Sequence, residues 1–196
     1  MDKIRIFLTG VGGQGTLTAT TLLANIALDN DIPVTAGEIH GMAQRGGVVE
    51  SFVLMGGWKS PRIDLGEADI LLGFEPLETL RALPYLKKNG LIVSNSEPML
   101  PPGVAAGRES YPDLDLIKSK ASAWASKTLF LPCRSLGIEA GSPLAANTVL
   151  MAALFGSGAL PFGLDALERG IGMYMKPKIV DLNIRAMRLA DRALAN

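Results

Sequence analysis

Six short apolar runs are spaced along the chain, most of them rich in β-branched side chains and bounded by glycine, proline or asparagine. They lie at residues 4–8, 33–36, 48–55, 68–74, 91–94 and 129–131. This pattern predicts strands. The run at 68–74 is apolar at almost every position, which is typical of a parallel strand covered on both faces.

Stretches with helical spacing of apolar residues separate these runs. They lie at residues 14–29, 76–86, 144–155, 163–174 and 177–194. The alternation of strands and helices predicts an α/β, Rossmann-like three-layer fold with a mostly parallel sheet and helices on both faces. A length of 196 residues suits one such domain, residues 1–196.

Residues 97–112 break the alternation, because this stretch contains four prolines and two glycines. We expect a long surface excursion here. It is either a tolerated insertion or a flap that contacts a partner.

Residues 140–164 have two features of a membrane-spanning segment. They carry no charged side chain and are long enough to cross a bilayer. Prolines, glycines and an asparagine interrupt them, and the longest apolar core is residues 149–155. We therefore expect a short buried helix in a soluble protein.

Charge and cysteine content narrow the function classes. Lysine plus arginine equals aspartate plus glutamate, at 19 each, so no net field favours nucleic acid or a membrane. One cysteine and one histidine cannot build a four-cysteine iron–sulfur cluster or a zinc site, so the chain should hold no metal of its own. Cys133 follows an apolar run and is expected to be an inert, buried strand thiol. The lack of disulfides and of a signal-peptide pattern predicts a cytoplasmic protein.

A glycine-rich turn, Gly10-Val-Gly12-Gly13-Gln14-Gly15, stands between the first predicted strand and the first predicted helix. In that position backbone amides and the helix dipole can face an anion. The spacing G-x-G-x-x-G also fits a dinucleotide site, for which Glu38 could bind the ribose hydroxyls. Alternatively, the glycines serve only tight packing between strand and helix.

A second motif, residues 37–47, has neither helical nor strand periodicity and contains four glycines. It concentrates Glu38, the only histidine, His40, and the pair Gln44 and Arg45. Glycines at this density allow close backbone approach, so we expect a loop shaped to meet a ligand or partner. Arg45 can hold a phosphate or carboxylate through two hydrogen bonds, and His40 can exchange a proton near neutral pH. His40 could equally satisfy local loop carbonyls.

Together the motifs Gly10-Val-Gly-Gly-Gln-Gly15 and Glu38-Ile-His-Gly-Met-Ala-Gln-Arg-Gly-Gly47, leading into the strand at 48–55, resemble the gamma-type domain of 2-oxoacid:ferredoxin oxidoreductases. The resemblance covers essentially the whole chain. Within that family, the histidine in the second motif is most similar to small subunits of the indolepyruvate type, also called pyruvate/ketoisovalerate oxidoreductase gamma domains.

The resemblance implies a subunit that is not active alone. Thiamine diphosphate and iron–sulfur clusters would lie in a large partner subunit, which passes electrons to ferredoxin, and coenzyme A would be a co-substrate. The residues expected to line the shared cleft are Gly10, Gly12, Gly13, Gln14, Gly15, Glu38, Gln44 and Arg45, with His40 and Arg45 as the catalytic candidates. Arg45 would position a phosphate of coenzyme A or the substrate carboxylate.

Three interpretations stay open at this point. The chain is an oxidoreductase subunit that needs a large iron–sulfur partner, a stand-alone NAD(P)-binding Rossmann oxidoreductase, or an interaction module without a catalytic role. The sequence does not select one 2-oxoacid, because specificity would lie largely in the partner.

Overall fold

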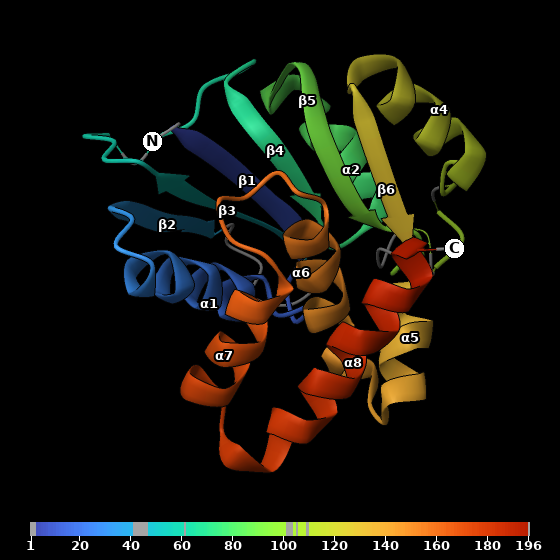
Figure 1. Ribbon diagram of the computed structural model, residues 1–196. Coiled ribbons are helices and arrows are strands. Elements are labelled where there is room, and N and C mark those ends of the chain that lie inside the picture. The colour runs from blue at the N-terminus through green and yellow to red at the C-terminus, as the bar shows by residue number, and fades with distance from the viewer. Residues whose placement is uncertain are drawn as a thin grey trace.

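The computed structural model describes residues 3–40, 47–60, 62–100, 104, 106–108 and 110–195 of the 196-residue chain. Its six strands are β1 Ile4–Val11, β2 Val34–His40, β3 Val48–Met55, β4 Ala68–Gly73, β5 Leu86–Asn95 and β6 Lys127–Leu131. They form one sheet in the order β2-β3-β1-β4-β5-β6 (Figure 1). Every predicted strand is therefore present, and β3 has the predicted bounds.

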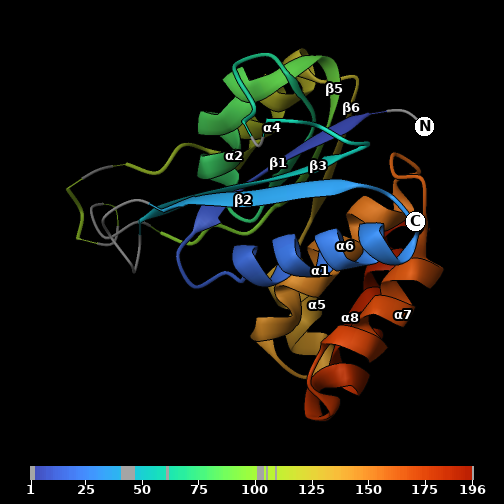
Figure 2. The ribbon, with the colours of Figure 1, turned by 90° about the vertical axis from the view of Figure 1, so that its left-hand side faces the viewer.

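Helices cover both faces of this sheet, as predicted. The helices are α1 Thr16–Asp29, α2 Pro76–Ala82, η1 Leu83–Tyr85, α4 Leu114–Trp124, α5 Cys133–Ala140, η2 Pro143–Ala145, α6 Ala146–Gly156, α7 Leu164–Tyr174 and α8 Pro177–Ala195. Helices α1, α5, α6, α7 and α8 lie on one side of the sheet, and α2 and α4 lie on the other (Figure 2). The three-layer α/β fold is confirmed.

The sheet is mixed at one side. Strands β1, β4, β5 and β6 are parallel neighbours, whereas β3 pairs antiparallel with both β1 and β2. Strand β2 thus runs in the direction of β1 but is separated from it by β3. The β2–β3 hairpin was predicted as two strands joined by a loop at 37–47. The structure extends β2 to His40, because its backbone continues to pair with β3 up to the partner Val49.

Apolar side chains form a core on each side of the sheet. The larger core surrounds α6, in which every residue from Thr148 to Phe155 is buried between the sheet and α8. This confirms the short buried helix predicted at 149–155. None of the helices in the described ranges is both long and apolar enough to cross a membrane.

Two helices were not predicted. Helix α4 is short and mostly exposed, and α5 begins directly after β6. Cys133 is buried, as expected, with 1% of its surface exposed, but it is the first residue of α5 and not part of a strand. The helix predicted at 76–86 ends earlier, since α2 passes into the 3-10 turn η1 and β5 starts at Leu86.

Candidate functional site

The carboxyl ends of the parallel strands meet at one edge of the sheet, which lies on the left in Figure 2. The glycine-rich turn follows β1 at this edge, and the excursion that begins at Ser96 follows β5 there. Ligands of open α/β sheets usually bind outside the carboxyl ends of the strands. This edge is therefore the candidate site.

The side chain of Gln14 holds the glycine-rich turn in place. Its Oε1 accepts a hydrogen bond from the amide of Val11 at 2.7 Å, and its Nε2 donates to the carbonyl of Phe74 at 3.1 Å. The amide of Gly12 donates to the carbonyl of Gly47 at 3.0 Å, and that of Gln14 donates to Val11 at 3.2 Å. Three amides of the turn thus have partners within the chain, and Gln14 shapes the turn through its own side chain.

Close packing explains two of the glycines. A Cβ at Gly10 would lie 2.7 Å from Cβ of Phe74, and one at Gly15 would lie 2.7 Å from Nδ2 of Asn147. Gly15 also has a left-handed φ of 84° and caps helix α1. Gly13 has φ 103° and faces open space, so its backbone is the accessible part of the turn. The packing interpretation of the turn accordingly holds for Gly10 and Gly15.

The second motif lies across β3 from the turn. Glu38 and His40 belong to β2, whereas Gln44 and Arg45 lie outside the described residues. Glu38 is aligned with Ser51 of β3, and Ser51 with Leu8 of β1. Two strand spacings, about 10 Å, therefore separate the backbone of Glu38 from β1.

That separation bears on the dinucleotide interpretation. In a Rossmann site the strand carrying the ribose-binding acid is the direct neighbour of β1, and free amides of the turn face the pyrophosphate. Here β3 occupies the neighbouring position, and the amides of Val11, Gly12 and Gln14 are already engaged. The geometry disfavours dinucleotide binding.

Asn95, at the end of β5, connects the strand ends to the excursion and to α5. Its Nδ2 donates to the carbonyls of Phe74 at 3.1 Å and Glu97 at 2.9 Å. Its Oδ1 accepts from the amides of Glu97 and Cys133, each at 3.1 Å. Phe74 thus receives hydrogen bonds from both Gln14 and Asn95, which join the glycine-rich turn to the base of the excursion.

Glu75 anchors the excursion at two points. It is fully buried, with 0% exposed, and its Oε1 accepts a hydrogen bond from the hydroxyl of Tyr111 and one from the amide of Met99 at 3.2 Å. The Tyr111 hydroxyl in turn accepts from the amide of Leu77 at 3.1 Å. Burial, and then the hydrogen bond to Glu75, raise the pKa of Tyr111 well above its usual range. Both ends of the excursion are therefore fixed to the start of α2.

Two further carboxylates lie on the α2 side of this edge. Burial raises the pKa of Glu50 and of Glu78, and the nearby charges of Glu75 and Glu50 also raise that of Glu78. Arg81 lowers the pKa of Glu78 in part, through a contact of 2.7 Å between its Nη1 and Oε1 of Glu78. Sequence reasoning missed four polar residues here, because each is a single polar residue outside any recognisable motif. Glu50 lies within strand β3, Glu75 and Asn95 lie at strand ends, and Glu78 lies within helix α2.

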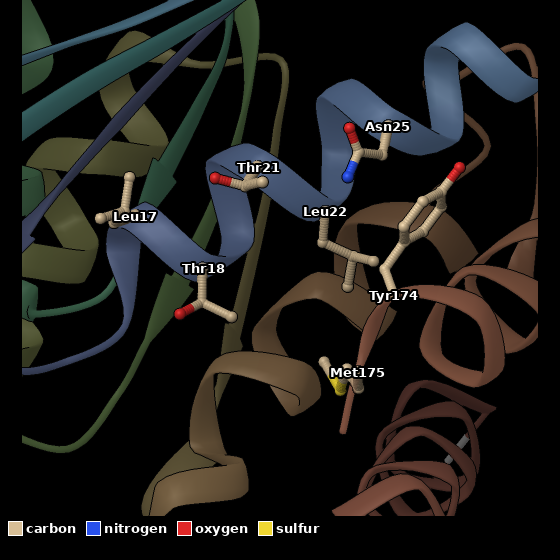
Figure 3. A pocket seen from close by; sticks show the side chains of 7 residues that line it. All are labelled: Leu17, Thr18, Thr21, Leu22, Asn25, Tyr174 and Met175. Atoms are coloured by element: carbon tan, nitrogen blue, oxygen red, sulfur yellow. The ribbon is translucent and has the colours of Figure 1, made fainter. Parts of the chain in front are cut away.

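A groove of about 290 Å³ lies between α1 and the end of α7 (Figure 3). It is lined by Leu17, Thr18, Thr21, Leu22, Asn25, Tyr174 and Met175. Tyr174 donates its hydroxyl to both carboxylate oxygens of Asp29, at 2.6 and 2.7 Å. The lining is apolar with a few hydroxyl and amide groups and offers no acid–base pair, so the groove is not the candidate catalytic site.

The described residues do not fit the redox cofactors of a ferredoxin-dependent reaction. No group of three or more histidine, cysteine, aspartate or glutamate residues in these ranges could hold a metal ion. Cys133 is the only cysteine of the chain and is buried, and one thiol cannot supply the four thiolates that hold an iron–sulfur cluster.

The sequence similarity to known proteins extends over nearly the whole chain. The profile of the family described as "Pyruvate ferredoxin/flavodoxin oxidoreductase" matches residues 5–193. A protein named indolepyruvate oxidoreductase subunit IorB, from Archaeoglobus fulgidus, is 40% identical over 187 residues, 95% of this chain and 93% of the relative. A protein of the same name from Pyrococcus horikoshii is 39% identical and covers 98% and 96%.

Solved structures of low sequence identity share the fold. The gamma subunit of a keto/oxoacid ferredoxin oxidoreductase from Geobacter sulfurreducens superposes with a TM-score of 0.71 at 20% identity, over 98% of this chain and 99% of that one. The 2-oxoglutarate:ferredoxin oxidoreductase of Magnetococcus marinus gives a TM-score of 0.69 at 16% identity, over 98% of this chain and 32% of that one. On the strength of its sequence matches, the chain belongs to the pyruvate ferredoxin/flavodoxin oxidoreductase family.

Proposed function

We propose that this chain is the small subunit of an indolepyruvate:ferredoxin oxidoreductase and acts only together with a large subunit. The observation that carries the proposal is the similarity to relatives named as indolepyruvate oxidoreductase subunits. Four such relatives are 33–40% identical, and each match covers at least 93% of this chain and of the relative.

The complex would oxidise an arylpyruvate with coenzyme A. The carboxylate leaves as carbon dioxide, the acyl group forms a thioester with the coenzyme A sulfur, and two electrons and one proton are released. Ferredoxin takes the electrons. Thiamine diphosphate and the iron–sulfur clusters would belong to the large subunit, because the described residues of this chain fit neither a cluster nor a metal-bound diphosphate.

The contribution of this chain would come from the carboxyl edge of its sheet. The exposed backbone at Gly13 would form part of the wall of a cleft shared with the large subunit. Arg45 would hold an anion there, either a phosphate of coenzyme A or the substrate carboxylate, and His40 would be a secondary polar contact. Cytoplasmic location stays a prediction.

Reconstitution tests this function directly. The chain is co-expressed with its candidate large subunit, and the complex is assayed without oxygen for reduction of a viologen dye by indolepyruvate and coenzyme A. We expect activity in the complex and in neither subunit alone. Phenylpyruvate and hydroxyphenylpyruvate are assayed in parallel to define the substrate range.

A different outcome would favour the dehydrogenase interpretation. If this chain does not associate with the large subunit and binds NAD(P)H tightly by itself, the proposal is wrong. The engaged turn amides and the position of Glu38 argue for the opposite result.

A further inference from the structure

One face of the β2–β3 hairpin has no helix over it in the described part of the chain. Helices α2 and α4, which cover this side of the sheet, pack over β1, β4, β5 and β6 (Figures 1 and 2). The opposite face of the hairpin is covered by α1. A sheet face that is left open in this way is normally polar.

The open face is instead largely apolar at the edge of the sheet where β2 ends and β3 begins. Ile39 is 58% exposed and Val48 is 38% exposed. Phe52 lies against Gly37, where a Cβ would be only 2.5 Å from its ring. Register places Ile39 beside Glu50, so one carboxylate stands among these apolar residues. Contiguous exposed apolar residues on a sheet typically mark a surface for another protein.

The carboxylates on this face lack a full set of cationic partners. Within the described ranges, Glu50 has no hydrogen-bond or ion-pair partner. Glu78 is close enough for the charge of Glu50 to raise its pKa, and its buried Oε2 also lacks a hydrogen-bond partner in these ranges. Arg81 contacts only the other oxygen of Glu78. A buried or half-buried carboxylate without a cation is unfavourable, so the face is suited to receive one.

Charge decides between two occupants of this face. A second copy of the chain docked with its twofold axis at Glu50 would bring the two Glu50 carboxylates together, and like charges would repel. A different protein can supply a lysine or arginine within an apolar surround. The face therefore fits a heterologous partner with a basic anchor residue.

We propose that the open face of the β2–β3 hairpin docks the large subunit, which inserts a lysine or arginine beside Glu50 and covers Ile39, Val48 and Phe52. This inference rests on the proposed function and adds the surface that joins the two subunits. The hydrogen bond from the amide of Gly12 to the carbonyl of Gly47 joins this end of β3 to the glycine-rich turn. A partner docked on the open face would therefore also lie beside that turn.

Cysteine labelling maps the surface in the intact complex. Cys133 is the only cysteine of this chain and is buried, so Ile39→Cys gives this subunit its one accessible thiol, and labelling is read on this subunit alone. Leu65→Cys is the matched control. Leu65 is 67% exposed and precedes β4 at the opposite edge of the sheet. In the complex we expect maleimide labelling at position 39 to slow by at least about tenfold, because the thiol becomes accessible only on dissociation, while labelling at position 65 is unchanged.

Charge variants test the basic anchor. Glu50→Lys should abolish association, and the nearly isosteric Glu50→Gln should weaken it by about tenfold, with a smaller salt dependence of association. Glu139→Lys is the matched control, since Glu139 is exposed on α5 on the other side of the sheet. Circular dichroism checks that each variant is folded. If Glu50→Lys does not fold, Glu50→Gln still tests the proposal.

Two results would overturn the docking surface while leaving the proposed function intact. One is an Ile39→Cys complex that stays active and in which position 39 labels as fast as in the free Ile39→Cys subunit. The other is protection of position 39 in the absence of the large subunit, which would show that a second copy covers the face. If the wild-type chains do not associate at all, the proposed function falls together with the docking surface.

Discussion

The amide of Gly12 donates a hydrogen bond of 3.0 Å to the carbonyl of Gly47, and this bond joins the two motifs that are far apart in the sequence. Gly12 lies in the turn after β1, and Gly47 is the last residue of the second motif. Because β3 pairs along the whole length of β1, the two motifs end at the same edge of the sheet. The contact places the two motifs side by side, and the cleft shared with a partner stays a prediction.

Arg45→Ala should impair saturation of the reconstituted complex. If Arg45 holds an anion, loss of one desolvated, charge-assisted contact costs about 2 kcal/mol, which raises the half-saturating concentration of coenzyme A or of the 2-oxoacid roughly thirtyfold. Steady-state kinetics with each substrate varied in turn identifies which anion is held. Arg134→Ala, at an exposed position of α5, is the control. Unchanged saturation for both substrates would rule out the proposed role.

Gly15→Ala should destabilise the subunit more than Gly158→Ala. Both glycines have a left-handed φ, 84° and 77°, so both variants carry a backbone cost of about 1–2 kcal/mol. Only at Gly15 would the new Cβ also meet a neighbour, Nδ2 of Asn147 at 2.7 Å, whereas Gly158 faces open space. Because Nδ2 is the free end of the Asn147 side chain, that side chain must rotate to make room, and we expect about 0.5–1.5 kcal/mol of additional loss, measured by urea unfolding. Asn147→Ala in the Gly15→Ala background should restore part of it.

Tyr111→Phe should release the excursion. It removes a hydroxyl that serves the buried Glu75 carboxylate and the amide of Leu77, and a buried group left without a partner costs about 1–3 kcal/mol. Urea unfolding gives the loss, and limited proteolysis between residues 100 and 110 should become faster. Tyr174→Phe is a matched control, because the hydroxyl of Tyr174 also donates to a carboxylate but at an exposed site. This variant should change the free energy of unfolding little. Equal effects of the two variants would contradict the anchoring role of Tyr111.

Glu50→Gln should change how the stability of the free subunit depends on pH. Burial raises the pKa of Glu50 in the folded state above its ordinary 4.5, so between these two values the folded chain binds more protons than the unfolded chain. Stability therefore falls as pH rises through this window, and the penalty is complete above the raised value. The variant should be more stable than the wild type at pH 7 and equally stable near pH 4.

Urea unfolding across this pH range measures that effect, with Glu139→Gln as an exposed control. The docking surface predicts the opposite consequence in the complex, where Glu50→Gln weakens association. A variant that stabilises the free subunit and also strengthens association would show that no cation approaches Glu50.

The thiol of Cys133 should be inert in the folded subunit. It is 1% exposed and burial raises its pKa, so a thiol reagent should react only after unfolding, which a colorimetric titration in the presence and absence of denaturant measures. Cys133→Ala should leave the iron–sulfur spectrum and the activity of the complex unchanged. Loss of a cluster signal in this variant would place a ligand in this chain.

Local pattern was sufficient for most secondary structure. The strand at 48–55 and the helices α6, α7 and α8 were predictable because an apolar face or run repeats at the period of the element. Helix α4 was not predicted, because it buries only Ile117 and Ala121 and so has almost no apolar stripe. Helix α5 was missed because it follows β6 after a single proline, and Cys133 was assigned to the preceding apolar run.

The sequence by itself determined the fold class, the glycine-rich turn and the family, because these depend on periodic apolar patterns and short motifs that can be read along the chain. Only the tertiary structure decided that β3 lies between β1 and β2, that Glu75 binds Tyr111, and that no helix of the described residues covers one face of the β2–β3 hairpin. These features join residues that are remote in sequence. They result from strand order and from the partners available to buried polar groups, which local propensity and periodicity do not encode.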